Sequence, residues 1–190
     1  MTSTSYGSAA YLEQLRTILG TLNTAEVDRI IEIITNAAAE GRQVFICGNG
    51  GSASTASHAI TDWNKMTYIH TGQPFRGVCL NDNVGLITAF ANDVDYAEVF
   101  VGQLRSLVRA GDVVIAISGS GNSPNVVRAI EHANGAGAIT IGFCGFDGGK
   151  LKAAAQHSVW VRSRDMQICE DVHLSLCHMV MKALCRVPVS

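Results

Sequence analysis

Apolar residues recur along the chain in two alternating patterns. Helical spacing covers residues of about 9–20 and 24–40, where Leu12 and Leu15 share one face, as do Val27, Ile30 and Ile34. Short runs rich in β-branched residues follow, at about 43–47, 77–80, 112–117, 138–143 and 158–162. Further helical stretches lie between or after these runs, at about 53–66, 84–91, 95–109, 123–136 and 166–186.

The strand runs are apolar on both faces and are separated by helices. This combination is typical of a parallel sheet that helices cover on both sides. The pattern therefore predicts an α/β fold, a three-layer doubly wound sandwich with a five-stranded parallel sheet. Ligands of such folds bind at the carboxyl ends of the strands, so the loop after each strand run is the first place to look for a site.

Length and composition are consistent with one domain over residues 1–190. Apolar residues make up 47% of the 190-residue chain, which is enough for a sizeable core, and the net charge is −2. A chain that coats nucleic acid would need a basic surface, so we expect no nucleic-acid partner. Charged residues are only 16%. This low share predicts an oligomer, with the N-terminal helices of about 9–40 in subunit contacts.

The chain carries no recognisable targeting or membrane signal. Its start lacks a basic segment followed by an apolar one, and its longest aliphatic runs are too short to span a bilayer. The six cysteines contain no C-x-x-C pair, and four of them lie within apolar runs. We therefore expect reduced core thiols and a cytoplasmic protein without a membrane partner.

Two glycine-rich loops each follow a predicted strand and precede a helix. The first is Gly48-Asn49-Gly50-Gly51-Ser52, and the second is Ser118-Gly119-Ser120-Gly121-Asn122-Ser123-Pro124. Glycines let the backbone turn and approach a ligand, and the helix start offers free N–H groups and a positive dipole end. Ser118, Ser120 and Ser123 add neutral donors, and Ser123 stands at the N-cap before Pro124. The second loop thus predicts a phosphate cradle without a lysine, as suits a sugar phosphate.

A dinucleotide site is the main rival interpretation of the first loop. Gly48, Gly50 and Ala53 match G-x-G-x-x-A, but that motif requires an acidic residue at the end of the second strand, about 20 residues on. Asp62 instead falls within a helix, and the second strand run ends much later, at Leu80. A Walker-type loop is excluded because no G-x-x-x-x-G-K-[ST] occurs.

Histidines and carboxylates form a second group of candidates. His58 and Asp62 lie four residues apart on a predicted helix and so share a face, while Glu170, His173 and His178 lie near the C-terminus. Two histidines with two carboxylates could hold a divalent metal such as zinc, or could perform acid–base chemistry on a carbonyl. Glu170 and His178 are about 12 Å apart along a straight helix axis. For both to reach one ion, Glu170 must reach back along the helix or the site must join two subunits.

These residues together resemble the phosphoheptose isomerases, which are SIS-domain (sugar isomerase) proteins. The resemblance rests on Cys47 to Ser52, His58-x-x-x-Asp62, Asn92-Asp93, Ile117 to Ser123 and Asp147-Gly148-Gly149, in order and with matching spacing. It implies interconversion of sedoheptulose 7-phosphate and D-glycero-D-manno-heptose 7-phosphate by a homotetramer with sites between subunits. It implies one zinc per subunit, bound by His58, Asp62, Glu170 and His178.

The resemblance also assigns roles to individual positions. Asp62, His178 and Glu170 would be catalytic. The substrate-binding positions would be Asn49, Gly50, Gly51, Asp62, Asn92, Asp93, Ser118, Gly119, Ser120, Ser123 and Glu170. Two positions depart from the family pattern, since Asp62 stands where the family has Glu and Glu170 where it has Gln. Met66 also replaces a customary Arg, and Gln167 a customary Asp.

One alternative function belongs to a different class. Some close SIS-domain relatives are tetrameric adaptors that bind a replication-initiation protein and lack the full metal and base set. This chain keeps an ionisable group at all four positions, which favours an isomerase. A sugar-phosphate-sensing regulator would need a DNA-binding module, for which the α/β pattern leaves no room.

Overall fold

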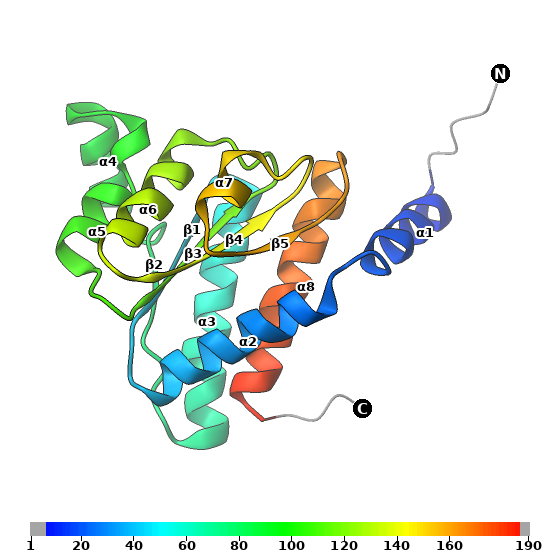
Figure 1. The fold of residues 1–190 in the computed structure, drawn as a ribbon, viewed down its shortest axis with the longest axis horizontal. Coiled ribbons are helices and arrows are strands. Elements are labelled where there is room, and N and C mark those ends of the chain that lie inside the picture. The colour runs from blue at the N-terminus through cyan, green and yellow to red at the C-terminus, as the bar shows by residue number, and fades with distance from the viewer. Residues whose placement is uncertain (1–6, 187–190) are drawn as a thin grey trace.

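Five parallel strands form one sheet at the centre of the molecule in the computed structural model, which describes residues 7–186 (Figure 1). The strands are Val44–Gly48 (β1), Gly77–Cys79 (β2), Val113–Ser118 (β3), Ile139–Cys144 (β4) and His157–Trp160 (β5). Their order is β2-β1-β3-β4-β5, and every neighbouring pair is parallel. The predicted five-stranded doubly wound sheet is confirmed. The strand order reverses between β1 and β3, the two strands that precede the glycine-rich loops.

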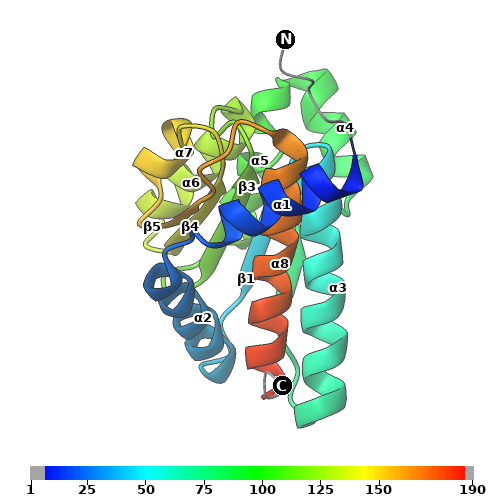
Figure 2. The same ribbon diagram turned by 90° about the vertical axis from the view of Figure 1, so that its right-hand side faces the viewer.

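Helices cover both faces of the sheet. The bounds are Ser8–Leu19 (α1), Thr24–Ala39 (α2), Gly51–Thr71 (α3), Val84–Asp93 (α4), Val101–Leu107 (α5), Pro124–Gly135 (α6), Gly149–Ala154 (α7) and Met166–Leu184 (α8), with a 3₁₀ turn at Tyr96–Glu98 (η1). α2, α3 and α8 pack on one face, and α5, α6 and α7 on the other (Figures 1 and 2).

Alternate side chains of each central strand enter the two cores. Val44 and Ile46 of β1 face α2, α3 and α8, whereas Phe45 and Cys47 face α5 and α6. Both β1 and β3 are buried over their whole length. Continuous apolar runs are therefore required there, because a strand between two helix layers has no solvent face.

Three details of the predicted helices were wrong. The stretch 95–109 is not one helix, because the Asp95 side chain accepts the Ala97 N–H and closes η1 before α5 begins. α3 continues past its predicted end at residue 66 as far as Thr71. It ends there because Gly72 adopts the left-handed conformation, at φ 70°, that commonly terminates a helix. α7, of six residues, was missed because it is too short to show a helical period.

α1 lies on the outside of the molecule and buries none of its residues (Figures 1 and 2). Leu15 and Ile18 pack partly against α8, while Leu12 stays 62% exposed. The Tyr11 hydroxyl donates to Asp171 of α8 over 2.7 Å, and this bond raises the pKa of Tyr11 to about 12. α1 thus leaves the large apolar side chains of Leu12 and Leu19 exposed.

Two further expectations can be compared with the described residues. All six cysteines are free and buried, as predicted, and burial raises the pKa of Cys177 to about 12. Between residues 7 and 186, no helix is long and apolar enough to cross a membrane.

His173 of α8 is the most unusual core residue. Its side chain is fully buried and stacks on Phe143, with ring centroids 6.1 Å apart. Neither ring nitrogen has a hydrogen-bond partner among the described residues. Burial lowers the pKa of His173 from 6.5 to about 4.

The buried imidazole should make the fold sensitive to acid. The folded pKa lies below the unfolded one, so the unfolded chain binds the proton more readily. The free energy of unfolding should have its full value above about pH 6.5 and should fall by about 3 kcal/mol as the pH drops toward 4. His173→Leu should remove this loss of stability at low pH, as measured by melting curves taken from pH 7 to 4. His70→Leu, at an exposed position on α3, should leave it unchanged, and parallel curves for parent and His173→Leu would contradict the assignment.

Candidate functional site

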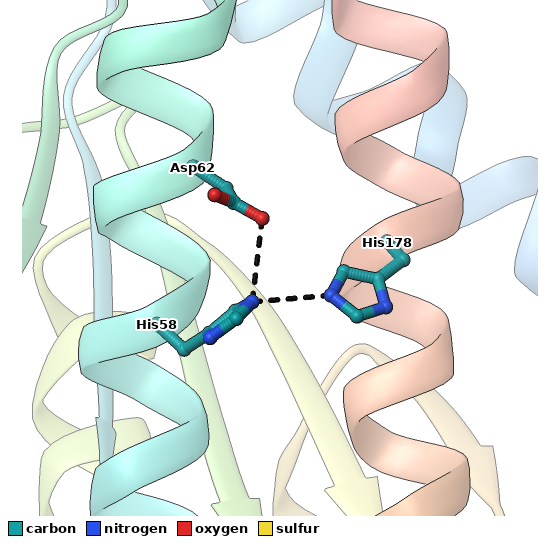
Figure 3. Close-up of side chains that lie close together, drawn as sticks. All are labelled: His58, Asp62 and His178. Atoms are coloured by element: carbon teal, nitrogen blue, oxygen red, sulfur yellow. Dashed lines mark hydrogen bonds and ion pairs between the residues drawn. The ribbon is translucent and has the colours of Figure 1, made fainter.

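α3 and α8 lie side by side and bring three of the predicted metal ligands together (Figures 2 and 3). His58 and Asp62 extend from consecutive turns of α3, and His178 faces them from α8. Nε2 of His58 lies 3.1 Å from Nε2 of His178 and 3.3 Å from Oδ2 of Asp62. One ligand atom from each residue lies within 4.8 Å of the other two. The predicted i, i+4 pairing of His58 with Asp62 is therefore present in the structure.

A buried tryptophan fixes the spacing of these two helices. Trp63 follows Asp62 on α3, is fully buried, and donates from its indole N–H to the Cys177 carbonyl over 2.9 Å. Cys177 precedes His178, so this bond joins the two helices beside the cluster. Phe75 meets the other side of the indole edge-on, with ring centroids 5.8 Å apart. The indole was not among the sequence-based candidates, and only its position next to Asp62 could have pointed to it.

The cluster offers a donor set that suits zinc, and two of its three separations fit such a site. Tetrahedral zinc with bonds of about 2.0–2.1 Å separates neighbouring ligand atoms by about 3.3 Å. The two separations from His58 Nε2, 3.1 and 3.3 Å, agree with this value. Two imidazole nitrogens and one carboxylate oxygen also match the three-ligand sets of catalytic zinc sites, which keep a fourth position for water or substrate.

Glu170, the fourth predicted ligand, is not part of this cluster. It lies two turns before His178 on α8, and its carboxylate instead lies against Gly51, at the first residue of α3. A Cβ added at Gly51 would collide with that carboxylate. The axial separation of Glu170 and His178 explains the difference, and the positive end of α3 favours a negative group there. Within one chain, Glu170 faces the first glycine-rich loop.

The second glycine-rich loop runs from the end of β3 to the start of α6. The hydroxyl of buried Ser118 accepts the Gly121 N–H over 3.1 Å, and that of Ser120 accepts the Asn122 N–H over 3.3 Å. Ser123 is the N-cap residue of α6, as predicted, but its hydroxyl makes no capping bond. Ser118 and Ser120 therefore shape the loop, whereas the Ser123 hydroxyl is available to a ligand.

Gly121 is required by its neighbours and not only by a ligand. Its φ is +66°, and an added Cβ would collide with the Gly148 carbonyl. The Gly121 carbonyl accepts the Leu151 N–H over 2.8 Å, so the Asp147-Gly148-Gly149 turn supports this loop from behind. Within the chain, the contact that demands a glycine at position 121 is therefore an internal one. Gly119 similarly packs on the Met166 sulfur.

The first glycine-rich loop is held by side chains from three other segments. Asn81 donates to the Gly48 carbonyl over 2.8 Å and accepts the Gly48 N–H over 3.2 Å, which fixes the end of β1. Asn49 pairs with Asn125 of α6 and accepts a hydrogen bond from Tyr96 of η1. Gly50, at φ +54°, follows Asn49 and immediately precedes α3.

Asn92 and Asp93 form the exposed C-terminal end of α4. The Asn92 amide donates to the Asp93 carboxylate over 2.7 Å, and between residues 7 and 186 neither side chain hydrogen-bonds to a glycine-rich loop. Tyr96, three residues after Asp93, makes that connection through Asn49. Sequence patterns did not single out Tyr96 or Asn125, because neither belongs to a catalytic residue type at a diagnostic spacing.

Comparison with known proteins identifies the family of this chain. The family model described as "SIS domain" matches residues 10–145. A probable phosphoheptose isomerase of Thermoplasma acidophilum is 36% identical over 170 residues, which cover 90% of this chain and 93% of the relative. A phosphoheptose isomerase of Thermodesulfovibrio yellowstonii is 37% identical over 159 residues, which cover 83% of this chain and 78% of the relative. The chain belongs to the phosphoheptose isomerase family of SIS-domain proteins.

A solved structure of this family also shares the fold. The phosphoheptose isomerase of Neisseria gonorrhoeae superposes with a TM-score of 0.86 at 28% identity, over 94% of this chain and 97% of that one. The family resemblance predicted from the motifs is therefore confirmed. These relatives carry the name of an isomerase, and they lend no support to the replication-adaptor alternative.

Proposed function

We propose that this protein interconverts sedoheptulose 7-phosphate and D-glycero-D-manno-heptose 7-phosphate. The observation that carries the proposal is the cluster of His58, Asp62 and His178, found in a chain that is 36% identical to a relative over 93% of that relative's length. The cluster offers groups that accept and donate protons, as an aldose–ketose isomerase needs. We further propose that one SIS domain accounts for residues 1–190.

The reaction moves a proton between two neighbouring carbons. A base removes the C1 proton of the ketose, and an acid protonates the C2 carbonyl oxygen, which gives an enediol. The same base then returns its proton to C2, while the O1 proton leaves to the group that acted as acid. We assign Asp62 as the base and His178 as the acid on the oxygens, each through the side-chain atom that does not hold the metal. Glu170, at the positive end of α3, would accept hydrogen bonds from sugar hydroxyls.

His58, Asp62 and His178 would hold one zinc ion per subunit. When bound, zinc would stabilise the negative charge that develops on the substrate oxygens. His58 makes no other proposed contribution, so its role is to hold the ion and to orient Asp62, 3.3 Å away. Glu170 remains a candidate ligand only if it comes from another subunit.

The substrate phosphate, at the far end of the sugar from the reacting carbons, would bind the loop Ser118 to Ser123. Gly119 supplies backbone there, and the N-terminus of the twelve-residue α6 supplies a positive dipole end. Asn49, Gly50, Gly51, Asn92 and Asp93 would contact the intervening hydroxyls. Binding energy from the phosphate would orient the distant reacting end.

Ser123→Ala should weaken binding of sedoheptulose 7-phosphate by about 0.5–1.5 kcal/mol, the value of one neutral hydrogen bond. Ser120→Ala should weaken binding by at least this amount, because it also removes the hydrogen bond from the Asn122 N–H that helps to shape the loop. Titration calorimetry would measure both, with Ser106→Ala on α5, which bonds only within its own helix, as the control. Unchanged affinity in both loop variants would place the phosphate elsewhere.

A homotetramer in the cytoplasm completes the proposal. Large apolar side chains stay exposed on several elements, among them Leu12, Tyr68, Ile69 and Met179. The six free buried thiols suit a reducing compartment. Sedimentation at micromolar concentration should give about four times the 20.2 kDa chain mass. A fully active species of the single-chain mass would contradict both the tetramer and shared sites.

The test of the function is a turnover assay on sedoheptulose 7-phosphate beside other ketose phosphates, with metal content measured on the same sample. Turnover with a preference for the seven-carbon substrate is expected. A parent protein that is inactive on every ketose phosphate would overturn the isomerase assignment.

A further inference from the structure

The two glycine-rich loops are joined by a reciprocal pair of asparagine amides. The Asn49 Nδ2 donates to the Asn125 Oδ1 over 2.9 Å, and the Asn125 Nδ2 donates back to the Asn49 Oδ1 over 2.9 Å. Asn49 belongs to the loop after β1, whereas Asn125 lies in the first turn of α6, directly after the phosphate loop. Asn125 is 1% exposed. Its amide therefore faces Asn49 and not solvent.

The orientation of both amides follows from a backbone group. The Val126 N–H donates to the Asn125 Oδ1 over 3.0 Å and is shared with the Ser123 carbonyl, 3.1 Å away, as is common at helix starts. Because this donor needs an acceptor, the side-chain atom of Asn125 beside it must be Oδ1, and the other terminal atom must be Nδ2. The Asn49 Oδ1 must then lie against the Asn125 Nδ2, since a flipped Asn49 amide would set oxygen against oxygen and nitrogen against nitrogen.

Tyr96 fixes the same orientation from a third segment. Its hydroxyl donates to the Asn49 Oδ1 over 3.0 Å. The two acceptor positions of this oxygen are thus both used, and one of the two Nδ2 hydrogens is bonded to Asn125. Among the described residues, the second Nδ2 hydrogen has no partner. Asn49 is left with a single free polar group, and that group is a donor.

We propose that Asn125 is a positioning residue, which holds the Asn49 amide so that its free N–H donates to a carbonyl or hydroxyl oxygen of the sugar phosphate. The inference rests on the proposed function, because it gives this donor a substrate oxygen to bind. The same pair ties the loop that contacts the sugar to the start of α6, where the phosphate binds. Asn125 itself touches Asn49 and not the substrate.

A double-mutant cycle tests whether Asn125 acts through Asn49. Asn125→Ala should lower kcat/KM for sedoheptulose 7-phosphate about tenfold, the effect of one misplaced hydrogen bond. In an Asn49→Ala background, Asn125→Ala should have no further effect. Asn134→Ala removes another hydrogen-bonded asparagine of α6 and is the control. Its effect should multiply with that of Asn49→Ala. Full multiplication in the Asn125 cycle would overturn the inference.

Two additions keep the test decisive if Asn125→Ala folds poorly or the parent is inactive. Tyr96→Phe removes only the exposed hydroxyl and should show the same coupling to Asn49 with a smaller effect. Hydrogen exchange of the segment 48–54, measured without substrate, should rise in Asn125→Ala and Tyr96→Phe but not in Asn134→Ala. An inactive parent would overturn the proposed function. Unchanged exchange in this segment would overturn the coupling of the loops.

Discussion

His178→Ala should abolish both zinc binding and isomerase turnover while leaving the fold intact. His178 contributes one of three ligand atoms in the cluster, and it is also the proposed acid on the substrate oxygens. Loss of the acid–base role alone would lower kcat about 100- to 10,000-fold. The residue is only half-buried, and the bond that joins α3 to α8 is made by the neighbouring Cys177 carbonyl, so the helices should stay packed.

The measurement is zinc per chain by mass spectrometry, with kcat and the melting temperature of the zinc-free protein on the same preparation. His70→Ala is the matched control, because it removes an exposed histidine from the far end of α3. It should retain parent zinc content and turnover. Parent zinc content in His178→Ala would remove His178 from the ligand set.

Asp62→Asn and Glu170→Gln should have opposite outcomes for the metal. Asp62 lies in the cluster, so its neutral amide should bind zinc weakly and cannot serve as the base, and turnover should be lost. Glu170 lies against Gly51, so Glu170→Gln should retain the zinc of the parent and part of its turnover. Each substitution removes one negative charge and keeps the side-chain size, which makes the two variants controls for each other.

The same two measurements separate the remaining assignments. Zinc loss in Glu170→Gln would show that Glu170 reaches the ion from another subunit. Retained zinc with abolished turnover in Glu170→Gln would transfer the role of base from Asp62 to Glu170. Full activity of Asp62→Asn would remove the proposed base altogether.

The sequence predicted the sheet well because its signals are local. Val113 to Ile117 and Val44 to Cys47 are apolar on both faces, which only a strand between two helix layers requires. The pairing of His58 with Asp62 was equally local, since helical geometry alone sets it. The position of Glu170 was not predictable in this way. It depends on how α8 packs against the start of α3, which no spacing in the sequence encodes.

The supporting contacts were missed for the same reason. Trp63 appears in the sequence as an apolar position of a helix, and its indole bond to Cys177 spans 114 residues. Asn125 appears as an ordinary first-turn residue after Pro124, and its pair with Asn49 spans 76 residues. His173 was grouped with the candidate metal and acid–base residues in the sequence, and the structure instead buries it completely in the core.

The span between His58 and His178 has a consequence for how the chain matures. These two proposed ligands are 120 residues apart, and the second lies in α8, the last helix among the described residues. A chain still emerging from the ribosome carries His58 and Asp62 long before it carries their partner. Zinc that binds all three ligands can therefore bind only after α8 has docked on α3, and its binding energy adds to the stability of the finished fold. Metal uptake would then mark the docking of α8, and chains that stop short of α8 would stay metal-free.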